Sequence, residues 1–260
     1  MMRIALGVEY DGRDFHGWER QGDARTVQSV LEAALSRVAD HGVRTVCAGR
    51  TDAGVHALGQ IVHFDSNAPR SERAWMLGAN ANLPSDVAVT WAKGVAEDFH
   101  ARFSARARRY RYLLYNRHTR PAVLRDRVTW EPRRLDVDRM RVASGYLLGE
   151  HDFSAFRGAG CQARSAVRRI NAMEVTRRGP LVMIDVSANA FLLHMVRNIA
   201  GVLVAIGSNR ASPGWAMEVL EARDRTRGGV TAPAAGLYLV QVDYPGHFRI
   251  PAVPPESALW

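Results

Sequence analysis

The repeated order of predicted strands and helices is the feature that most constrains the fold of this chain. The first hundred residues contain segments in the order strand, helix, strand, strand, helix, strand: 3–10, 26–38, 44–49, 59–64, 71–81 and 86–95. The remaining residues repeat this order with one additional helix: 108–116, 136–149, 167–179, 180–188, 189–207, 214–224 and 236–244. The repeat is one of structure, because the two halves show no convincing residue-level similarity.

Such a repeat predicts an α+β fold made of two related split β-α-β halves of the ferredoxin or RRM type. The halves meet near residues 102–107, so we expect an N-terminal half at 1–105 and a C-terminal half at 106–260. No low-complexity linker separates them, and we therefore expect the halves to pack as one body with a central cleft.

The charge of the chain favours a nucleic acid as its partner. Lys and Arg number 35 against 26 Asp and Glu, a net charge of +9, and Lys93 is the single lysine. Codon usage in a GC-rich genome explains the preference for arginine, but it does not explain the excess of positive charge. Guanidinium groups bind phosphates and stack on bases, so the excess indicates a nucleic acid, with a solvated basic surface as the alternative.

The sequence carries no signal for a membrane, a leader peptide or a metal. Its strongest apolar run, residues 201–207, is far shorter than the roughly 18–20 residues that span a bilayer. The N-terminus goes directly into a strand pattern, which predicts a cytoplasmic protein. Cys47 and Cys161 lack metal-ligand spacing and the histidines form no metal motif, so we expect no metal site.

The densest basic region, residues 101–127, contains nine arginines interleaved with aromatic residues. In a strand, Tyr110 and Tyr112 share one face while Arg109 and Arg111 share the other. Arginine mixed with aromatics is typical of surfaces that bind a phosphate backbone and stack bases. The alternative is a strand with one face in the core and a solvated charged face.

A second candidate lies in the segment GRTDAG, where Arg50 and Asp52 stand among small residues. Small neighbours let a large ligand approach the backbone, and a guanidinium two residues away can hold a carboxylate ionised. An ionised carboxylate in a cleft can act as a nucleophile or a base. A structural ion pair and an Asx-type turn are the alternatives, and we interpret His56 as a packing or backbone-bonding residue.

The same segment belongs to a longer block that closely resembles the signature of the tRNA pseudouridine synthase A family. The resembling blocks occur in the family's order and run nearly from end to end of the chain: 9–21, 48–64, 82–89, 98–112, 191–201 and 236–245. Two departures are small: His16 stands where an aromatic residue is common, and Glu19 replaces a usual glutamine.

The resemblance implies an enzyme without a cofactor that converts uridine to pseudouridine in the anticodon arm of tRNA, at positions 38 to 40. It implies a homodimer, and it implies that the sheets of the two halves join into one mixed sheet with the active site in the cleft between them. The N-terminal half would then carry the catalytic aspartate, and the C-terminal half the active-site tyrosine and the pocket wall.

The resemblance also implies roles for individual residues. Asp52 matches the catalytic aspartate, Arg50 the arginine that pairs with it and helps displace the target base, and Tyr110 the tyrosine that stacks on the uracil. Leu237 matches an apolar residue of the pocket. Further substrate-binding candidates are Arg109, Arg111, His194 and Arg197.

The sequence leaves the chemistry open at two points. Asp52 can attack the ribose or the uracil ring, or the reaction can begin with loss of a sugar proton. The rival functions are an RNA-binding protein without catalytic activity, made of two RRM-like units, and a nucleoside hydrolase that uses Asp52 and releases uracil. No RNP1-like pattern supports the first rival.

Overall fold

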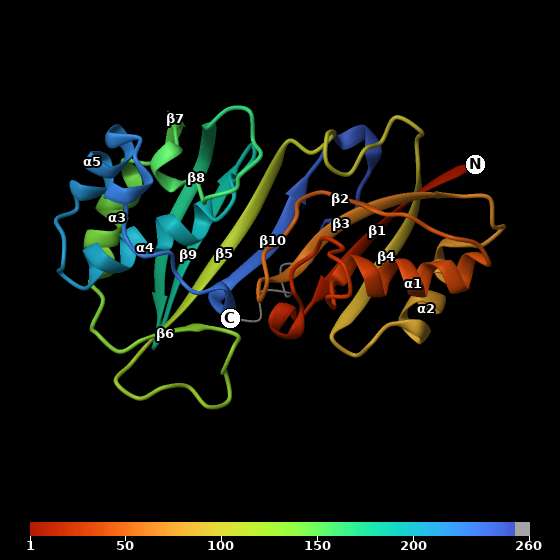
Figure 1. Cartoon of the computed structure of the whole chain (residues 1–260), viewed down its shortest axis with the longest axis horizontal. Helices are drawn as coiled ribbons and strands as arrows, with labels where there is room; N and C mark the ends of the chain where they lie inside the picture. Colours follow the sequence, from red (N-terminus) through yellow and green to blue (C-terminus); the bar gives the residue numbers. More distant parts are fainter. Residues whose placement is uncertain (253–260) are drawn as a thin grey trace. The chain divides into compact units, whose positions relative to one another are not determined.

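The computed structural model of the chain describes residues 1–252, which divide into two compact units. The first unit contains Met1–Arg108 and the C-terminal segment from Tyr238, and the second contains Arg109–Leu237. Both divisions fall inside strands, β5 (Ala107–Asn116) and β10 (Leu237–Asp243) (Figure 1). The observed boundary in β5 lies close to the predicted one, whereas the segment from Tyr238 is grouped with the first unit.

The first unit follows the predicted order of strands and helices. Its elements are β1 (Met2–Tyr10), α1 (Val27–Ala39), β2 (Val46–Cys47), β3 (His56–Ser66), α2 (Glu72–Asn82) and β4 (Val87–Val95). The strands form the order β4-β1-β3-β10, with β2 beside β3. β1 is antiparallel to both neighbours, and β10 is parallel to β3 with Tyr238 opposite His56. This pairing with β3 is why the C-terminal segment belongs to the first unit.

Local sequence explains where α1 begins and what it buries. The side chain of Thr26 accepts a hydrogen bond from the Ser29 backbone N–H, and the Ser29 hydroxyl accepts one from the Thr26 N–H, which forms a capping box. Val27, Leu31 and Leu35 are fully buried on the apolar face. α1 and α2 pack against each other and lie on one face of the sheet (Figure 1).

The second unit repeats the order with additions. Its elements are β5, β6 (Thr129–Glu131), α3 (Val137–Gly145), β7 (Gly149–Asp152), β8 (Val167–Arg178), β9 (Leu181–Ala188), α4 (Met195–Gly207) and α5 (Trp215–Ala222). The strands form the order β5-β9-β8-β7, with β6 parallel to β5. β7-β8 and β8-β9 are antiparallel. The predicted α+β class with mixed, mostly antiparallel pairing is confirmed.

Two predicted helices are shorter than expected. The helix predicted at 136–149 ends at Gly145, and Gly149 then adopts a left-handed φ of 94° where β7 begins. The helix predicted at 189–207 begins only at Met195, because His194 has a φ of 61°. Before it, the Asn189 side chain accepts hydrogen bonds from Arg169 N–H and Ala190 N–H, which favours a turn over a helix.

None of the helices within residues 1–252 combines the length and the apolar composition that a membrane crossing requires.

Candidate active site

Asp52 lies on the segment 48–55 that connects β2 to β3, which we call the Asp52 loop. Asp52 is half-buried and Arg50 is exposed. The Val55 N–H donates to the Asp52 carbonyl oxygen at 3.1 Å, so the backbone turns sharply immediately after the carboxylate. This turn presents the Asp52 side chain at the tip of a connection whose two ends are both fixed in the sheet.

A buried glutamine holds the first part of this loop. Gln60 of β3 is fully buried, and its side-chain amide donates to the Gly49 carbonyl oxygen at 2.6 Å. Its side-chain oxygen accepts hydrogen bonds from the N–H groups of Gly49 and Ile61. One side chain thereby satisfies both backbone groups of the residue before Arg50, which fixes the entry into the loop. Sequence reasoning missed this residue, because a glutamine in a strand has no local signature.

The segment 11–26 before α1 holds the second part of the loop. The Trp18 N–H donates to the Thr51 carbonyl oxygen at 3.0 Å, and the Gly54 N–H donates to the Phe15 carbonyl oxygen at 3.3 Å. Gly17 has a φ of 89°, and a Cβ there would lie 2.7 Å from the Thr51 carbonyl oxygen. The sequence block at 9–21 therefore holds the Asp52 loop in place through these contacts.

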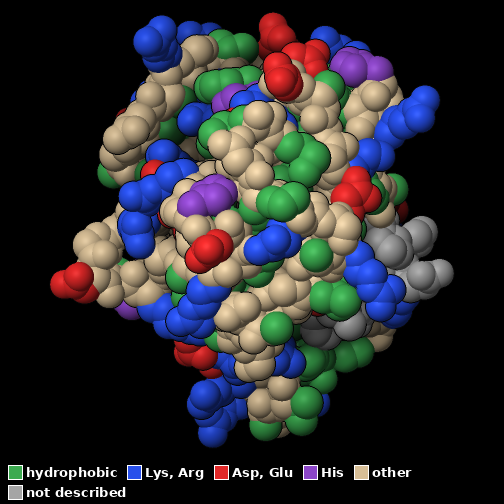
Figure 2. All heavy atoms as spheres, turned by 90° about the vertical axis from the view of Figure 1, so that its right-hand side faces the viewer, with side chains coloured by type: hydrophobic (Ala, Val, Ile, Leu, Met, Phe, Trp, Pro, Cys, Tyr) green, Lys and Arg blue, Asp and Glu red, His purple; other side chains and the backbone are tan. Residues whose placement is uncertain are grey.

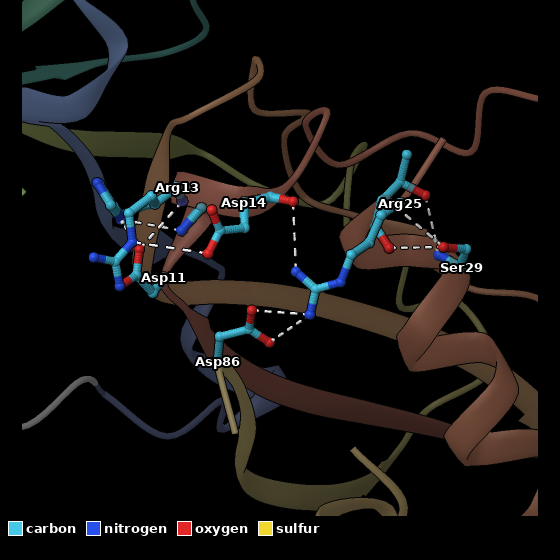
Figure 3. A network of polar contacts seen from close by, with 9 residues as sticks. Asp11, Arg13, Asp14, Arg25, Ser29 and Asp86 are labelled. Carbon is cyan, nitrogen blue, oxygen red and sulfur yellow. Dashed lines mark hydrogen bonds and ion pairs between the residues drawn. The ribbon is translucent and has the colours of Figure 1, made fainter. Parts of the chain in front are cut away.

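Arg25 fixes this supporting segment in turn (Figure 3). Its Nη2 donates to both carboxylate oxygens of Asp86, the residue before β4, at 2.9 Å. Its Nη1 reaches the Asp14 carbonyl oxygen at 3.5 Å, and the guanidinium lies 4.0 Å from the centroid of the Phe15 ring. The segment 11–26 is thus bound to the sheet as well as to the loop.

The guanidinium of Arg50 forms an ion pair with Glu19, a partner that the sequence did not predict. Arg50 Nη2 donates to Glu19 Oε1 at 2.9 Å, and Nε contacts the other carboxylate oxygen. The reason is the segment 11–26, which lies against the loop and brings Glu19 within reach of Arg50. The sequence signal for this partner was the departure from glutamine at that position.

Two residues near the loop are structural. Burial raises the pKa of the Cys47 thiol to about 12, which keeps it protonated and excludes it as a nucleophile at neutral pH. His56 is buried, accepts a hydrogen bond from the Gly12 N–H at Nδ1 and stacks on Tyr238 at 4.6 Å between ring centroids. The interpretation of His56 as a packing and backbone-bonding residue is confirmed.

In the second unit, β5 has the predicted alternation. Tyr110 and Tyr112 are buried, and the Tyr110 ring meets Phe191 edge-on at 5.1 Å between centroids. The Tyr112 hydroxyl donates to the Pro233 carbonyl oxygen, and burial raises the pKa of this phenol. Tyr112 is therefore a core residue with a satisfied hydroxyl.

Two of the three arginines of β5 share one carboxylate. Arg111 Nε lies 3.1 Å and Arg109 Nη2 lies 3.3 Å from Asp185 of β9. The Arg109 side chain is 42% exposed and that of Arg111 17%, so Arg109 has the larger surface available to a phosphate.

The remaining predicted residues also lie in the second unit. His194 and Arg197 stand at the beginning of α4, and Arg197 Nε donates to the Ala232 carbonyl oxygen at 2.8 Å. Leu237 is buried at the start of β10. A cavity of about 770 Å³ in this unit, beside α4 and β6, is lined by none of the predicted site residues. Within residues 1–252, no three His, Cys, Asp or Glu side chains are grouped as metal ligands.

Comparisons with known proteins agree with the sequence blocks. The sequence model of the family described as tRNA pseudouridine synthase matches residues 7–104 and 143–245. A relative from Coxiella burnetii (strain Dugway 5J108-111), named tRNA pseudouridine synthase A, is 59% identical over 254 residues, which cover 98% of this chain and 97% of the relative. Relatives with the same name from Alcanivorax borkumensis and Vibrio cholerae are 56% and 54% identical.

These two relatives cover 100% and 97% of this chain, and the matched residues include both the Asp52 loop and the beginning of α4. The resemblance inferred from six sequence blocks is thereby confirmed over nearly the whole length: the chain belongs to the tRNA pseudouridine synthase family.

Proposed function

We propose that this chain, as a member of that family, converts uridine to pseudouridine at positions 38 to 40 of the tRNA anticodon arm, with Asp52 as the nucleophile. The observation that carries the proposal is the Asp52 loop, whose backbone is held by Gln60, Trp18 and Phe15 while Asp52 itself is half-buried. Such fixation keeps a reacting group in one geometry, which is the main requirement of nucleophilic catalysis.

The reaction breaks the bond between the ribose and the base nitrogen, turns the uracil, and rejoins it through carbon 5. An ionised Asp52 serves each of three routes: attack on the ribose, attack on the ring, or removal of a sugar proton. No group enters or leaves and no electrons are transferred to another molecule, so the reaction needs no cofactor. A base must remove the proton from carbon 5 in the last step.

Arg50 would assist base flipping, which costs a few kcal/mol for a stacked base. Its present partner is Glu19, and both side chains are largely exposed. A phosphate of the bound tRNA would replace the Glu19 carboxylate as the partner of Arg50, so one anion is exchanged for another and no buried charge is left unpaired.

Tyr110 would stack on the target uracil, and Leu237 would line the apolar part of the pocket that keeps water from the broken glycosidic bond. The ring of Tyr110 is held by its edge-on contact with Phe191, which supports a fixed stacking surface. Arg109, Arg111, His194 and Arg197 would contact the RNA outside the reacting nucleotide, with Arg109 the most accessible of the β5 arginines. We further propose a cytoplasmic homodimer.

Product analysis tests the proposed function. Unmodified tRNA is incubated with the protein, and pseudouridine is mapped by nucleotide while free uracil is measured in the medium. We expect pseudouridine within positions 38 to 40 and no free uracil. Free uracil would instead identify a nucleoside hydrolase, and tRNA binding without any change to the RNA would identify a non-catalytic RNA-binding protein.

A further inference from the structure

Phe103 stands out among the Phe, Tyr and Trp residues of 1–252, because 75% of its surface is exposed. It lies in the turn 100–105 between β4 and β5, in the first unit. Single exposed apolar residues are common on protein surfaces, so exposure alone assigns no role to the side chain. The surroundings of Phe103 are what distinguish it.

The ring of Phe103 is held in place from one side. It stacks on the imidazole of His100 with 4.3 Å between ring centroids and 27° between the ring planes. His100 Nδ1 accepts hydrogen bonds from the N–H groups of Arg102 and Phe103, so this nitrogen carries no proton. The Phe103 ring therefore rests on a neutral aromatic ring, while most of the surface of the residue stays exposed to solvent.

The backbone of the turn is fixed as firmly as the ring. The Ala101 N–H donates to the buried His63, and the Ala101 carbonyl oxygen accepts from the Tyr244 hydroxyl at 2.6 Å. His100 N–H donates to the Ser104 hydroxyl at 3.0 Å. An aromatic ring that is ordered before binding loses little conformational entropy when a ligand stacks on it.

The turn is also joined to the Asp52 loop through one guanidinium. Arg108 is buried and its Nη2 donates both to the Arg102 carbonyl oxygen at 2.6 Å and to the Ala48 carbonyl oxygen at 2.9 Å. Ala48 is the first residue of the Asp52 loop, two positions before Arg50. Arg108 thus acts as a positioning residue that keeps Phe103 on the same rigid part of the first unit as the loop.

The chemistry around the ring indicates the ligand. The guanidinium of Arg102 lies 5.6 Å from the centroid of the Phe103 ring, and Arg102 and Arg106 are both exposed. An exposed aromatic ring beside a guanidinium fits an aromatic ligand that carries negative charge, which describes a nucleotide with its base unstacked. An aliphatic partner would gain nothing from the guanidinium of Arg102 beside the ring.

We propose that Phe103 is a stacking site for an unpaired base of the tRNA, with Arg102 on the adjacent phosphate. The proposal rests on the proposed function for the identity of the RNA. The base in this proposal is a different one from the uridine that reacts, which is assigned to Tyr110. Phe103 adds a contact outside the reacting nucleotide and raises the affinity for tRNA.

Binding measurements on four variants test this site: Phe103→Ala, Phe103→Leu, Phe103→Trp, and Leu77→Ala as a control. Leu77 is an exposed apolar residue of α2 in the same unit. The Kd for an unmodified tRNA anticodon stem-loop is measured by fluorescence anisotropy at one fixed salt concentration. We expect about tenfold weaker binding for Phe103→Ala, nearly as large a loss for Phe103→Leu, and wild-type binding for Phe103→Trp and Leu77→Ala.

Three results would overturn the proposal. The first is a Kd for Phe103→Ala within twofold of wild type. The second is wild-type binding by Phe103→Leu, which would indicate that the side chain packs and does not stack. The third is an altered mass of Phe103→Ala in sedimentation, which would indicate that Phe103 contacts another copy of the protein. The assay reads binding and not turnover. A wild-type chain that binds the stem-loop but makes no pseudouridine would contradict the proposed function. The effect of the Phe103 substitutions on the Kd would still test whether Phe103 stacks on a base.

Discussion

Gly17 lies against the Asp52 loop so closely that the structure has no space for a side chain at this position. Its φ of 89° is unfavourable for other residues, and an added Cβ would lie 2.7 Å from the Thr51 carbonyl oxygen. We expect Gly17→Ala to lower the free energy of unfolding by about 3 kcal/mol, from strain and overlap together. Displacement of the loop by about an ångström would also lower kcat about 100-fold.

Gly22 provides the matched control for this substitution. It has a φ of 44°, but a Cβ would meet no atom within 4 Å. Gly22→Ala should therefore cost only the backbone strain, about 1–2 kcal/mol, and leave kcat unchanged. Denaturant unfolding measures the stability of both variants, and steady-state kinetics measure their kcat. Equal effects of the two substitutions on kcat would contradict the role given to Gly17.

Gln60 is the second residue on which the loop depends. Gln60→Ala would remove the partners of the Gly49 N–H and carbonyl groups inside the protein. We expect the free energy of unfolding to fall by about 2–3 kcal/mol, because buried polar groups are left without hydrogen bonds. The exposed Gln162 serves as a control, since Gln162→Ala should change stability by less than about 0.5 kcal/mol. A stable Gln60→Ala protein would show that the loop does not need this side chain.

At the scale of elements, periodicity predicted the strands and helices well where one face is buried. α1 begins one residue after its capping threonine, and β8 and β9 flank the predicted Gly-Pro turn. Periodicity failed at the ends of α3 and α4, because apolar residues continue past the last helical turn or precede the first one. It also missed β6 and β7, because three or four residues are too few to show alternation.

The contact between β3 and the turn 100–105 gives the protein a dependence on pH. Burial, followed by the neighbouring His100 and Arg3, lowers the pKa of His63 to about 4, although Asp65 acts in the opposite direction. The unfolded chain binds a proton at this histidine near pH 6.5 and the folded chain does not. The free energy of unfolding should therefore be highest above pH 6.5 and fall as the pH is lowered toward 4.

Denaturant unfolding between pH 7.5 and 4.5 tests this expectation. His63→Asn keeps a hydrogen-bond acceptor for the Ala101 N–H but does not titrate, so its stability should fall less over this range than that of the wild type. The exposed His118 supplies the control, and His118→Asn should retain the wild-type slope. Identical slopes for His63→Asn and the wild type would contradict the assignment.

At the scale of the whole molecule, most of the positive charge is arginine, and on the face drawn in Figure 2 it is not gathered into one patch. On the face shown in Figure 2, Lys and Arg side chains are spread over the surface with Asp and Glu between them. Many of the arginines form ion pairs or bind carbonyl oxygens, as Arg25 and Arg108 do. The net charge of +9 therefore indicates a polyanionic partner but does not locate the surface that binds it.

Salt dependence measures how many of these charges meet phosphates. We expect the Kd for tRNA to rise at least tenfold between 50 and 200 mM salt, because each phosphate contact releases counterions from the RNA. The slope is obtained from binding titrations at four salt concentrations. A flat response would favour the alternative interpretation of the arginines as a solvated surface.

The sequence proposes candidate residues, but it does not predict the contacts that hold them. Family blocks identified Asp52, Arg50 and Tyr110, because each stands inside a long motif. They could not show that Arg50 pairs with Glu19, or that Gln60 holds the loop, because those contacts join segments that are distant along the chain. Contacts of this kind depend on how segments pack, which local sequence patterns do not encode.

The proposed function depends on the Asp52 carboxylate. Asp52→Ala is incubated with unmodified tRNA, and pseudouridine at positions 38 to 40 is quantified by mass spectrometry beside a measurement of tRNA affinity. Asp98→Ala, an exposed aspartate of the same unit, is the control. We predict that Asp52→Ala binds tRNA with wild-type affinity and forms no pseudouridine, while Asp98→Ala stays active. Pseudouridine formed by Asp52→Ala at the wild-type rate would show that Asp52 is not the nucleophile.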